Sequence, residues 1–345
     1  MTWLITGGCG FIGSNLADFL MEQGVEVALL DNLSRVGSNE NLQWLRTRHG
    51  ANWQFIHADI RDVNVVEESV KSLKPKVVAH LAGQVAMTTS LRNPRLDFEI
   101  NALGTLNVLE AIRLYSPDTI TLYSSTNKVY GSLEELRYGE TNQRYELLDY
   151  PDGLNETIQL DGHSPYGCSK LTGDQYMRDY SRMFQIRTVV FRHSSMYGGR
   201  QFATYDQGWL GWFCQKALEM KTPGNTPFTI SGNGKQVRDV LHAHDLVNVY
   251  VQAADKIEKS SGQIYNIGGG TDNSLSLLEL FELLENITGC SMRYEKIDWR
   301  HGDQKVFVAD ITKASRDFMW RPTISKRDGI VEMMEWSREL FNANK

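Results

Sequence analysis

Short apolar runs alternate with longer stretches of helical periodicity along the first half of the chain. Runs of five or six mostly apolar residues are typical of strands buried in a sheet, and we expect them at 2–6, 25–30, 53–57, 77–81, 119–123 and 186–191. Between them, apolar residues recur with the helical period over 11–23, 62–73, 94–115 and 165–184. Strands and helices that alternate in this way predict an α/β fold, a doubly wound parallel sheet with helices on both faces.

The pattern changes after Tyr197, where glycines, aromatic residues and short apolar runs follow one another. Here we expect strands at 228–231 and 236–242 and helices near 208–221 and 275–288. We interpret this part as a smaller mixed α/β lobe that binds the substrate, whereas the run 264–267 predicts a strand that returns to the main sheet. The predicted domains are therefore discontinuous: 1–193 plus about 241–270, and about 194–240 plus 271–345.

The segment 131–164 is polar, contains several glycines and shows no clear periodicity. Long irregular segments inside compact domains are uncommon and are usually functional. We therefore expect this segment to lie at the rim of a site, as a lid.

Composition and charge restrict the possible partners. The 345 residues are 41% hydrophobic and 23% charged, as in a soluble globular protein, and the formal net charge of −6 argues against nucleic acid or an anionic membrane as a partner. No apolar run reaches the roughly 18 residues that span a bilayer, and the first strand begins too early for a secretory leader. The cysteines (Cys9, Cys168, Cys214 and Cys290) lack the spacing of a metal site or a disulfide framework. We expect a cytoplasmic protein without a metal.

A glycine-rich loop, TGGCGFIG, lies between the first predicted strand and helix. Gly7, Gly10 and Gly13 would let the backbone turn tightly, so that the amino end of the helix approaches the pyrophosphate of a dinucleotide. Asp31, at the end of the second strand, can accept hydrogen bonds from the adenosine ribose, and its carboxylate would repel a 2′-phosphate. This favours NAD over NADP as the cofactor, although Arg35 could serve a 2′-phosphate.

Residues that follow the other strands are placed to contact the same cofactor. Asp59 could hold the adenine edge, or it could merely cap the next helix. For Asn101 we favour a structural role as a buried polar residue beside the cofactor. The remaining predicted cofactor contacts are Phe11, Ile12, Asn32, Ser34, Ile60, Leu81, Ala82, Gly83, Ser124 and His193.

Tyr166 and Lys170 lie four residues apart in SPYGCSK, so both face the same side of a predicted helix. A neighbouring ammonium lowers the phenol pKa from its usual value of about 10, which would make the tyrosine a better base. The fifth strand ends in YSSTNKVYG, where a hydroxyl can bind a substrate oxygen together with Tyr166. We assign this hydroxyl to Thr126, with Ser125 as the alternative. Downstream of a dinucleotide loop, the pair predicts hydride-transfer chemistry.

With these motifs in this order, the chain resembles the extended short-chain dehydrogenases/reductases, whose cofactor domain is a Rossmann-type sheet. The stretches GQVAMTTS, SSTNKVYG, HSPYGCSK and TISGNGKQVRDVLH are more specific and resemble the nucleotide-sugar epimerases. The resemblance implies that Tyr166 is the catalytic base and acid, that Lys170 is its partner and a ribose ligand, and that Thr126 binds the reacting oxygen. It also implies NAD as cofactor and a homo-oligomer of two or four copies, with the helices 94–115 and 165–184 at the interface.

Two departures from the family pattern narrow the expected reaction. Asn127 and Lys128 stand where members that dehydrate their sugar carry Asp-Glu, which argues against dehydration. Ser195 stands where the 4-epimerases usually carry Asn, which argues against inversion at C4. The resemblance then implies inversion at C2 of a CDP-hexose through a transient 2-keto sugar. The alternatives are a C4 epimerase of another nucleotide sugar, such as UDP-glucose, and a net NAD-dependent sugar dehydrogenase.

Two arginines lead the predicted substrate contacts. Arg200 and Arg238 would grip the diphosphate, because a planar guanidinium binds phosphate oxygens in bidentate fashion. Gln201 and Tyr205 could contact the base or the ribose of the nucleotide. The other predicted substrate contacts are Gln84, Met87, Thr126, His163 and Ser195.

Overall fold

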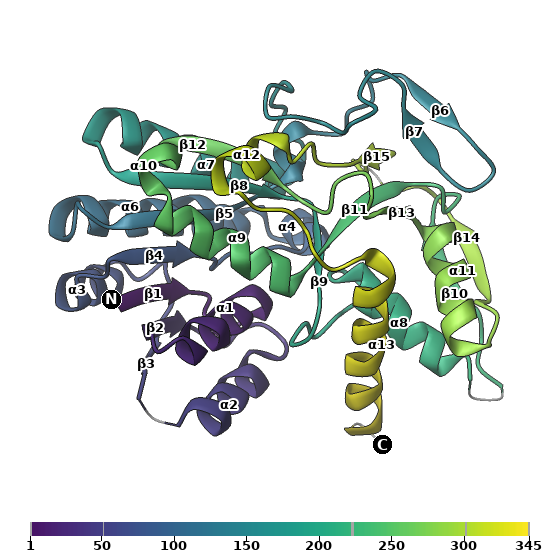
Figure 1. Cartoon of the computed structure of the whole chain (residues 1–345), viewed down its shortest axis with the longest axis horizontal. Coiled ribbons are helices and arrows are strands. Elements are labelled where there is room, and N and C mark those ends of the chain that lie inside the picture. The colour runs from purple at the N-terminus through teal and green to yellow at the C-terminus, as the bar shows by residue number, and fades with distance from the viewer. Residues whose placement is uncertain (1, 51, 222–223, 301, 344–345) are drawn as a thin grey trace.

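The computed structural model describes residues 2–50, 52–221, 224–300 and 302–343. Its main feature is a seven-stranded parallel sheet with the order β12-β8-β5-β4-β1-β2-β3 (Figure 1). The strands are β1 (Thr2–Thr6), β2 (Glu26–Asp31), β3 (Gln54–His57), β4 (Val77–His80), β5 (Ile120–Thr126), β8 (Arg187–His193) and β12 (Gln263–Ile267). The strand order reverses between β1 and β4, which leaves a crevice at the carboxyl ends of these strands. The predicted fold class is confirmed, including the return of 264–267 to the sheet.

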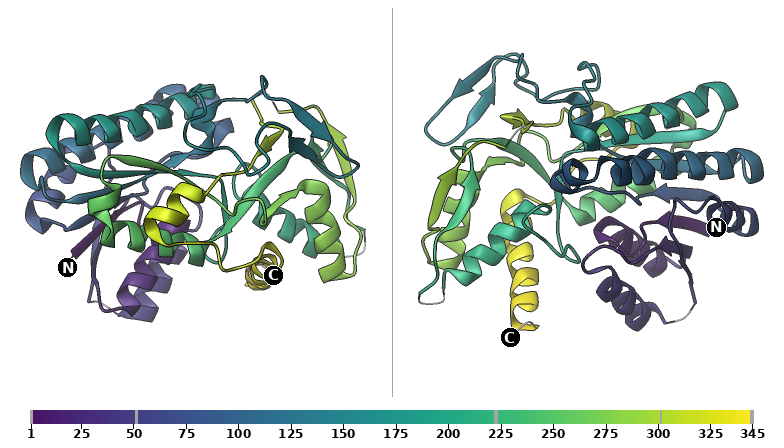
Figure 2. Two further views of the ribbon diagram at one scale, coloured as in Figure 1. Left: turned by 45° about the horizontal axis from the view of Figure 1, so that its top comes forward. Right: turned by 180° about the vertical axis from the view of Figure 1, so that it is seen from behind.

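Helices cover both faces of this sheet (Figures 1 and 2). One face carries α1 (Phe11–Glu22), α2 (Ser38–His49) and α9 (Ala243–Asp255), and the other carries α3 (Val63–Leu73), α6 (Gly104–Tyr115) and α7 (Ser164–Phe184). Successive side chains of a strand point to opposite faces. Accordingly, Trp3 and Ile5 of β1 belong to the apolar cluster under α1, and Leu4 belongs to the cluster under α6. A strand buried on both faces needs apolar residues at nearly every position, which is why these strands are visible in the sequence.

One predicted helix is interrupted in the structure. The range 94–115 is divided into α5 (Pro94–Phe98), a π-helical turn η1 (Glu99–Leu103) and α6. A π-helical turn is wider than an α-helical turn and often occurs at functional sites. The short helix α4 (Met87–Arg92) precedes this segment.

Several helices were not predicted. Apart from Leu42 and Leu45, the buried residues of α2 are polar, so its apolar pattern is weak. The other helices that the sequence reasoning missed include α9, α10 (Ile257–Ser260), α12 (Thr312–Phe318) and α13 (Lys326–Ala343).

A smaller mixed lobe lies beyond the carboxyl ends of the main strands (Figure 1). One of its sheets contains β9 (Ser195–Tyr197), β11 (Val237–His242), β13 (Ser274–Ser276) and β15 (Val306–Phe307), and another pairs β10 (Phe228–Ser231) with β14 (Tyr294–Ile297). The helices α8 (Trp209–Glu219), α11 (Leu277–Thr288) and α13 pack around an aromatic core that includes Phe213, Phe228 and Phe281. The predicted boundaries between the two domains stay a prediction.

The segment 131–164 is more ordered than its sequence indicates. It contains a hairpin of β6 (Tyr138–Glu140) and β7 (Tyr145–Leu147), and its Leu133 and Leu154 are buried against Phe307. The backbone N–H of Leu154 also donates to the carbonyl of Val308, 2.7 Å away. These apolar contacts are made with residues far along the chain, so no local periodicity shows them. The role of the segment as a lid stays a prediction.

Three further observations concern possible metals, thiols and membranes. Within the described ranges, no group of three or more histidine, cysteine or carboxylate side chains could hold a metal ion. All four cysteines are free thiols. Among the helices that the structure describes, none combines the length and the apolar character needed to cross a membrane.

Candidate active site

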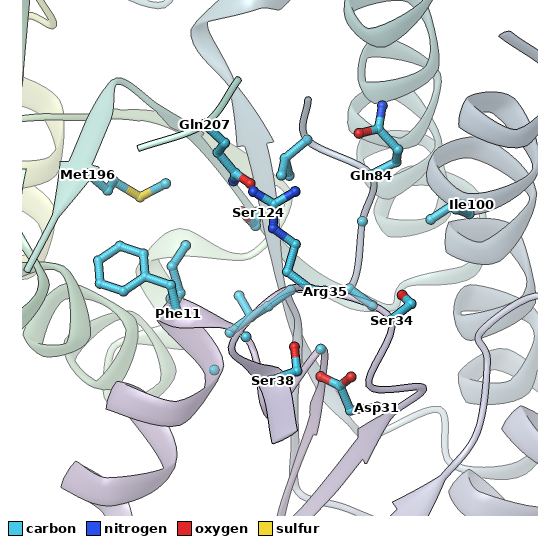
Figure 3. A pocket seen from close by; sticks show the side chains of 18 of the residues that line it. Phe11, Asp31, Ser34, Arg35, Ser38, Gln84, Ile100, Ser124, Met196 and Gln207 are labelled. Carbon is cyan, nitrogen blue, oxygen red and sulfur yellow. The ribbon is translucent and has the colours of Figure 1, made fainter. Parts of the chain in front are cut away.

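A cavity of about 550 Å³ lies at the carboxyl edge of the main sheet (Figure 3). The glycine-rich loop and the ends of β2, β4 and β5 form one side of it, and residues between Ser194 and Trp209 form the other. Figure 3 shows Asp31 and Ser34 toward one end, with Met196 and Gln207 contributed by the segment that leads into the second lobe. The cavity therefore follows the crevice and extends between the two lobes.

The glycine-rich loop is packed so closely that side chains would not fit. A Cβ atom at Gly7, where φ is +69°, would lie 2.7 Å from the backbone nitrogen of Ala82, and one at Gly13 would lie 2.2 Å from the carbonyl oxygen of Gly7. Helix α1 begins after Gly10 without a side-chain cap, so its first N–H groups have no side-chain acceptor. An uncapped helix end beside a bare backbone loop favours an anionic group, so these residues fit the pyrophosphate of a dinucleotide.

Asp31 closes the far end of the cavity. Its carboxylate accepts hydrogen bonds from the backbone N–H groups of Cys9, at 2.9 Å, and Leu33, at 2.8 Å. Burial raises the pKa of Asp31, and these backbone hydrogen bonds oppose the rise. Figure 3 shows the side chain of Arg35 extending from the same end of the cavity toward Gln207.

Asp59 and Ile60 also line the cavity, beside the loop that carries Asn32. The Asp59 carboxylate pairs with Arg61 at 2.8 Å and accepts a hydrogen bond from Asn32 at 2.9 Å, and these contacts hold its pKa at about 2. The helix that follows is capped by Asp62 instead. The alternative in which Asp59 caps this helix is therefore wrong.

Tyr166, Lys170 and Thr126 meet on the wall of the cavity. All three are buried, and a hydrogen bond links the Thr126 hydroxyl to the Tyr166 phenol. The Lys170 ammonium lies 4.6 Å from the centre of the Tyr123 ring. Burial raises the pKa of Tyr166 to about 12, and the hydrogen bond from Thr126 opposes only part of this rise.

The direction of this shift corrects the expectation that Lys170 lowers the phenol pKa below its usual value. Removing a phenolate from water costs more free energy than its interactions with the surrounding residues restore. Burial likewise lowers the pKa of Lys170 to about 8, although the carboxylates of Asp97 and Asp174 oppose this shift. Lys170 therefore remains mostly cationic at neutral pH.

Asn101 lies in the π-helical turn and is buried without lining the cavity. Its side-chain N–H group donates to the carbonyl of Gln84 at 2.9 Å and to the hydroxyl of Ser169 at 3.1 Å, while its oxygen accepts from the backbone N–H of Gln84. These bonds hold the loop after β4 against α7. The contacts agree with the structural role that the sequence indicates.

The remaining predicted residues fall into two groups. The cavity lining contains Phe11, Ile12, Ser34, Leu81, Ala82, Gly83, Gln84, Ser124, His193, Ser195, Arg200 and Gln201. It does not contain Met87, His163, Tyr205 or Arg238. The structure also places Trp209 in the wall, where its indole N–H donates to the Ser195 hydroxyl at 3.0 Å.

The two arginines predicted to clamp the diphosphate have different surroundings. The Arg200 guanidinium lies over the rings of Trp44 and Trp336, with 4.1 Å to the centre of the latter. Arg238 pairs with Asp303 at 2.7 Å. They do not share a partner, so the structure does not bring them together as one clamp.

Asp303 is instead shared by Arg238 and Lys128, the latter at 3.3 Å, and the charge of Arg300 acts on the same carboxylate. Three cations around one carboxylate leave an excess of positive charge close to Thr126. Such a cluster suits a diphosphate. Arg300 and the cationic role of Lys128 were missed by the sequence reasoning, because only the folded chain brings them to Arg238.

Comparisons with known proteins agree with this geometry. A family model described as GDP-mannose 4,6 dehydratase matches residues 4–333. The chain is 56% identical to a CDP-paratose 2-epimerase from Salmonella typhi, across 99% of this chain and 100% of that protein. Among solved structures, a Thermotoga maritima UDP-glucose 4-epimerase with UDP-glucose is 30% identical, with a TM-score of 0.83 over 99% of this chain and 100% of that one. A Bacillus cereus UDP-glucuronic acid 4-epimerase in complex with UDP-glucuronic acid and NAD is 28% identical, with the same TM-score and coverage. The chain therefore belongs to the GDP-mannose 4,6-dehydratase family of extended short-chain dehydrogenases/reductases, which contains nucleotide-sugar epimerases.

Proposed function

We propose that this protein is an NAD-dependent epimerase that inverts C2 of a CDP-hexose and converts CDP-paratose to CDP-tyvelose. The proposed substrate rests on the 56% identity to CDP-paratose 2-epimerase, which extends over 99% of this chain and 100% of that protein. The class of reaction is supported by the geometry, because a buried tyrosine, threonine and lysine line the same cavity as the glycine-rich loop.

The cofactor in this proposal is NAD, which when bound supplies a hydride acceptor with a positively charged ring. The glycine-rich loop and the amino end of α1 would hold its pyrophosphate, Asp31 its adenosine ribose, and Asp59 the adenine edge. Lys170 would bind the second ribose. The close packing at Gly7 and Gly13 supports this arrangement.

Tyr166 carries the proton chemistry. It accepts the proton of the C2 hydroxyl while that carbon is oxidised, and it returns the proton when C2 is reduced from the opposite face. Only the phenolate form can accept this proton, and because burial raises the phenol pKa to about 12, Thr126, Lys170 and the positively charged ring of the bound cofactor would have to stabilise that form. The 2-keto sugar must turn within the cavity without escaping, and the lobes on either side of the cavity keep it in place.

The cations around Asp303 would hold the diphosphate of the nucleotide sugar. Lys128, Arg238 and Arg300 provide the charge, and Lys128 is only two residues from Thr126. Diphosphate binding at this cluster would place the sugar ring near Tyr166. Dehydration of the sugar is not supported, because Asn127 and Lys128 supply neither a carboxylic acid nor a carboxylate at their two positions.

A second candidate is inversion at C4 of a UDP-sugar, which is favoured by the similarity to two UDP-sugar 4-epimerases. Against it, the Ser195 hydroxyl is engaged by Trp209 at the position where 4-epimerases usually carry Asn. A net dehydrogenase is the third candidate, and it would release NADH.

We also propose a cytoplasmic homo-oligomer. Free thiols at all four cysteines suit a reducing compartment. Apolar side chains are exposed along η1, the adjoining helices and α7, among them Phe98, Leu114, Met183 and Phe184. Figure 2 shows α6 and α7 side by side on one face, where a second copy would cover these side chains.

The proposed reaction can be tested by proton NMR with CDP-paratose in D₂O. Inversion at C2 without deuterium uptake is expected, because the hydride returns to the carbon from which it came. Deuterium at C2 would mean inversion by proton abstraction and would contradict the roles of NAD and Tyr166. Inversion of UDP-glucose with no reaction of CDP-paratose would favour the second candidate. A stoichiometric accumulation of NADH would favour the third.

A further inference from the structure

Two consecutive residues that follow Thr126 contact two consecutive residues of the second lobe. The Asn127 side chain donates to the Gln304 side-chain oxygen at 2.9 Å, and the Lys128 ammonium lies 3.3 Å from the Asp303 carboxylate. Gln304 lies just before β15 and is fully buried, with 0% of its surface exposed. The reaction described above uses neither amide.

The contacts of Gln304 fix which way its amide points. Its Nε2 atom donates to the carbonyl oxygens of Gly131, at 2.8 Å, and of Asn127, at 3.4 Å. A carbonyl can only accept hydrogen bonds, so the nitrogen of Gln304 must face these two groups and its Oε1 atom must face the Asn127 side chain.

The orientation of Asn127 follows from that of Gln304. Because Asn127 meets an acceptor at Gln304, its Nδ2 atom must lie on that side, and its Oδ1 atom lies toward Thr126. The Thr126 hydroxyl donates to this oxygen at 3.3 Å, and its Oγ1 atom also accepts the backbone N–H of Lys128 at 3.3 Å. A hydroxyl has one proton, so while Thr126 donates to Asn127 its Oγ1 atom can accept the proton of a neutral Tyr166 phenol, and the Thr126 proton must turn from Asn127 to the phenol oxygen when the phenolate forms.

We propose that Gln304 is a positioning residue for the catalytic hydroxyl. Through Asn127 it fixes the rotamer of Thr126, so that Oγ1 stays within reach of the Tyr166 oxygen and the Thr126 proton has one alternative acceptor, Asn127, from which it turns to the phenolate. The proposal rests on the proposed function, and it assigns to the second lobe a direct part in orienting the catalytic groups. The backbone N–H of Gln304 also donates to the Asp303 carboxylate at 3.1 Å, so the loop that orients Thr126 is the loop on which the cation cluster is built.

A double-mutant cycle tests whether Gln304 acts through Thr126. Gln304→Met keeps the approximate size and removes both hydrogen-bonding groups, and Thr126→Val removes the hydroxyl. Gln304→Met is expected to lower kcat about tenfold and to change KM for CDP-paratose less than about twofold. In the Thr126→Val background the same change is expected to lower kcat by less than about twofold, because the hydroxyl that Gln304 positions is absent. Effects that multiply in the double variant, or an unchanged kcat in Gln304→Met, would overturn the proposal.

Gln236→Met is the matched control, because Gln236 belongs to the same lobe but donates to the carbonyl of Ser231 at 3.0 Å. Its kcat is expected to equal that of the wild type. If Gln304→Met does not fold, Asn127→Ala interrupts the same relay from the other side and enters the same cycle.

A crystal structure of the Gln304→Met or Asn127→Ala variant tests the orientation without an activity measurement. In Gln304→Met the Asn127 side chain is expected to leave its present orientation, and in Asn127→Ala the Thr126 hydroxyl is expected to take a new rotamer. Retention of the Asn127 Oδ1 contact with Thr126 in the first variant, or of the Thr126 rotamer in the second, would contradict the proposal. A wild-type protein that does not epimerise CDP-paratose would defeat the proposed function, while the crystallographic result would still decide the role of Gln304.

Discussion

Tyr166 is buried in a way that favours its neutral form, with a pKa of about 12. A free phenolate at this position would be rare at neutral pH, so Tyr166 must lose its own proton, with the phenolate stabilised by the groups around it, before it can accept the proton of the substrate. The neighbouring groups can help only while charge develops on the phenol oxygen, and this is the condition under which preorganised donors accelerate a reaction most.

Tyr166→Phe is expected to lower kcat by roughly 10²- to 10⁴-fold, because general acid–base catalysis contributes that much. Tyr176→Phe removes a hydroxyl from the exposed face of the same helix and serves as the control. Steady-state kinetics with CDP-paratose provide the measurement. Full activity in the Tyr166 variant would remove this residue from the mechanism.

The pKa of Lys170 predicts how the rate of the reaction depends on pH. Its pKa is lowered to about 8 by burial, against the opposing charges of Asp97 and Asp174, so the side chain is charged below that pH and neutral above it. The buried His80 and His193 also face this ammonium, and both are neutral there because their pKa values are about 3. If the ammonium is required, kcat/KM should fall as pH rises through about 8.

Lys170→Arg tests this assignment, because a guanidinium stays charged across the same range. The variant is expected to be less active, since the geometry changes, but to lose the decline on the alkaline side. A pH–rate profile with the wild-type decline would attribute that decline to another group.

The loop between β1 and α1 shows how an element positions a ligand without side chains. Gly13→Ala would place a Cβ atom 2.2 Å from the carbonyl oxygen of Gly7, so the loop would have to open at a cost of about 1–3 kcal/mol. Titration calorimetry should show correspondingly weaker NAD binding. Gly199→Ala is the control, because nothing lies within 4 Å of its added Cβ. Equal affinities in the two variants would argue against the loop as the pyrophosphate site.

Elements also show what the sequence can and cannot reveal. The buried parallel strands are visible because both of their faces are apolar, and Tyr166 and Lys170 are visible because one helix carries both. Helix α2 is not visible, since its few buried leucines lie among polar residues. The contacts of Asn127 and Lys128 join residues 177 and 175 positions apart, so no local pattern indicates Gln304 or Asp303 as their partners.

At the scale of the whole molecule, the lowered pKa values of His80 and His193 predict that the free energy of unfolding decreases in acid. Burial lowers both pKa values to about 3, whereas an unfolded histidine titrates near 6.5. Between these values the unfolded chain binds protons that the folded chain does not, so the free energy of unfolding should fall as pH decreases from about 6.5 toward 3. The slope is at most about 1.4 kcal/mol per pH unit for each histidine.

Denaturant unfolding between pH 7 and 5 measures this slope. His80→Gln should reduce it, even if the variant is less stable overall. His244→Gln serves as the control, because it replaces an exposed histidine and leaves both buried rings in place. An undiminished slope in His80→Gln would mean that other groups determine the acid sensitivity.

The assembly is predicted from the exposed apolar side chains of α7. Met183→Glu places a charge on a side chain that is 67% exposed, at the face proposed to contact a second copy. It should shift the protein toward the monomer in analytical ultracentrifugation. Met319→Glu, at a methionine that is 82% exposed outside that face, should not. A monomeric wild type would contradict the proposed oligomer.

The π-helical turn η1 makes chain length itself a constraint on the site. Each residue of an α-helix advances the rotation by about 100°. A π-helical turn accommodates one extra residue, so deletion of one residue between 98 and 100 would let α5 and α6 join as one regular helix with their faces oriented as before, but it would shorten the spacing of Asp97 and Asn101 from four residues to three. Asp97 and Asn101 could then no longer both meet Gln84 and Ser169. A single-codon deletion here should damage the protein more than most substitutions, and a one-residue gap at this point in a related gene would indicate a differently built site.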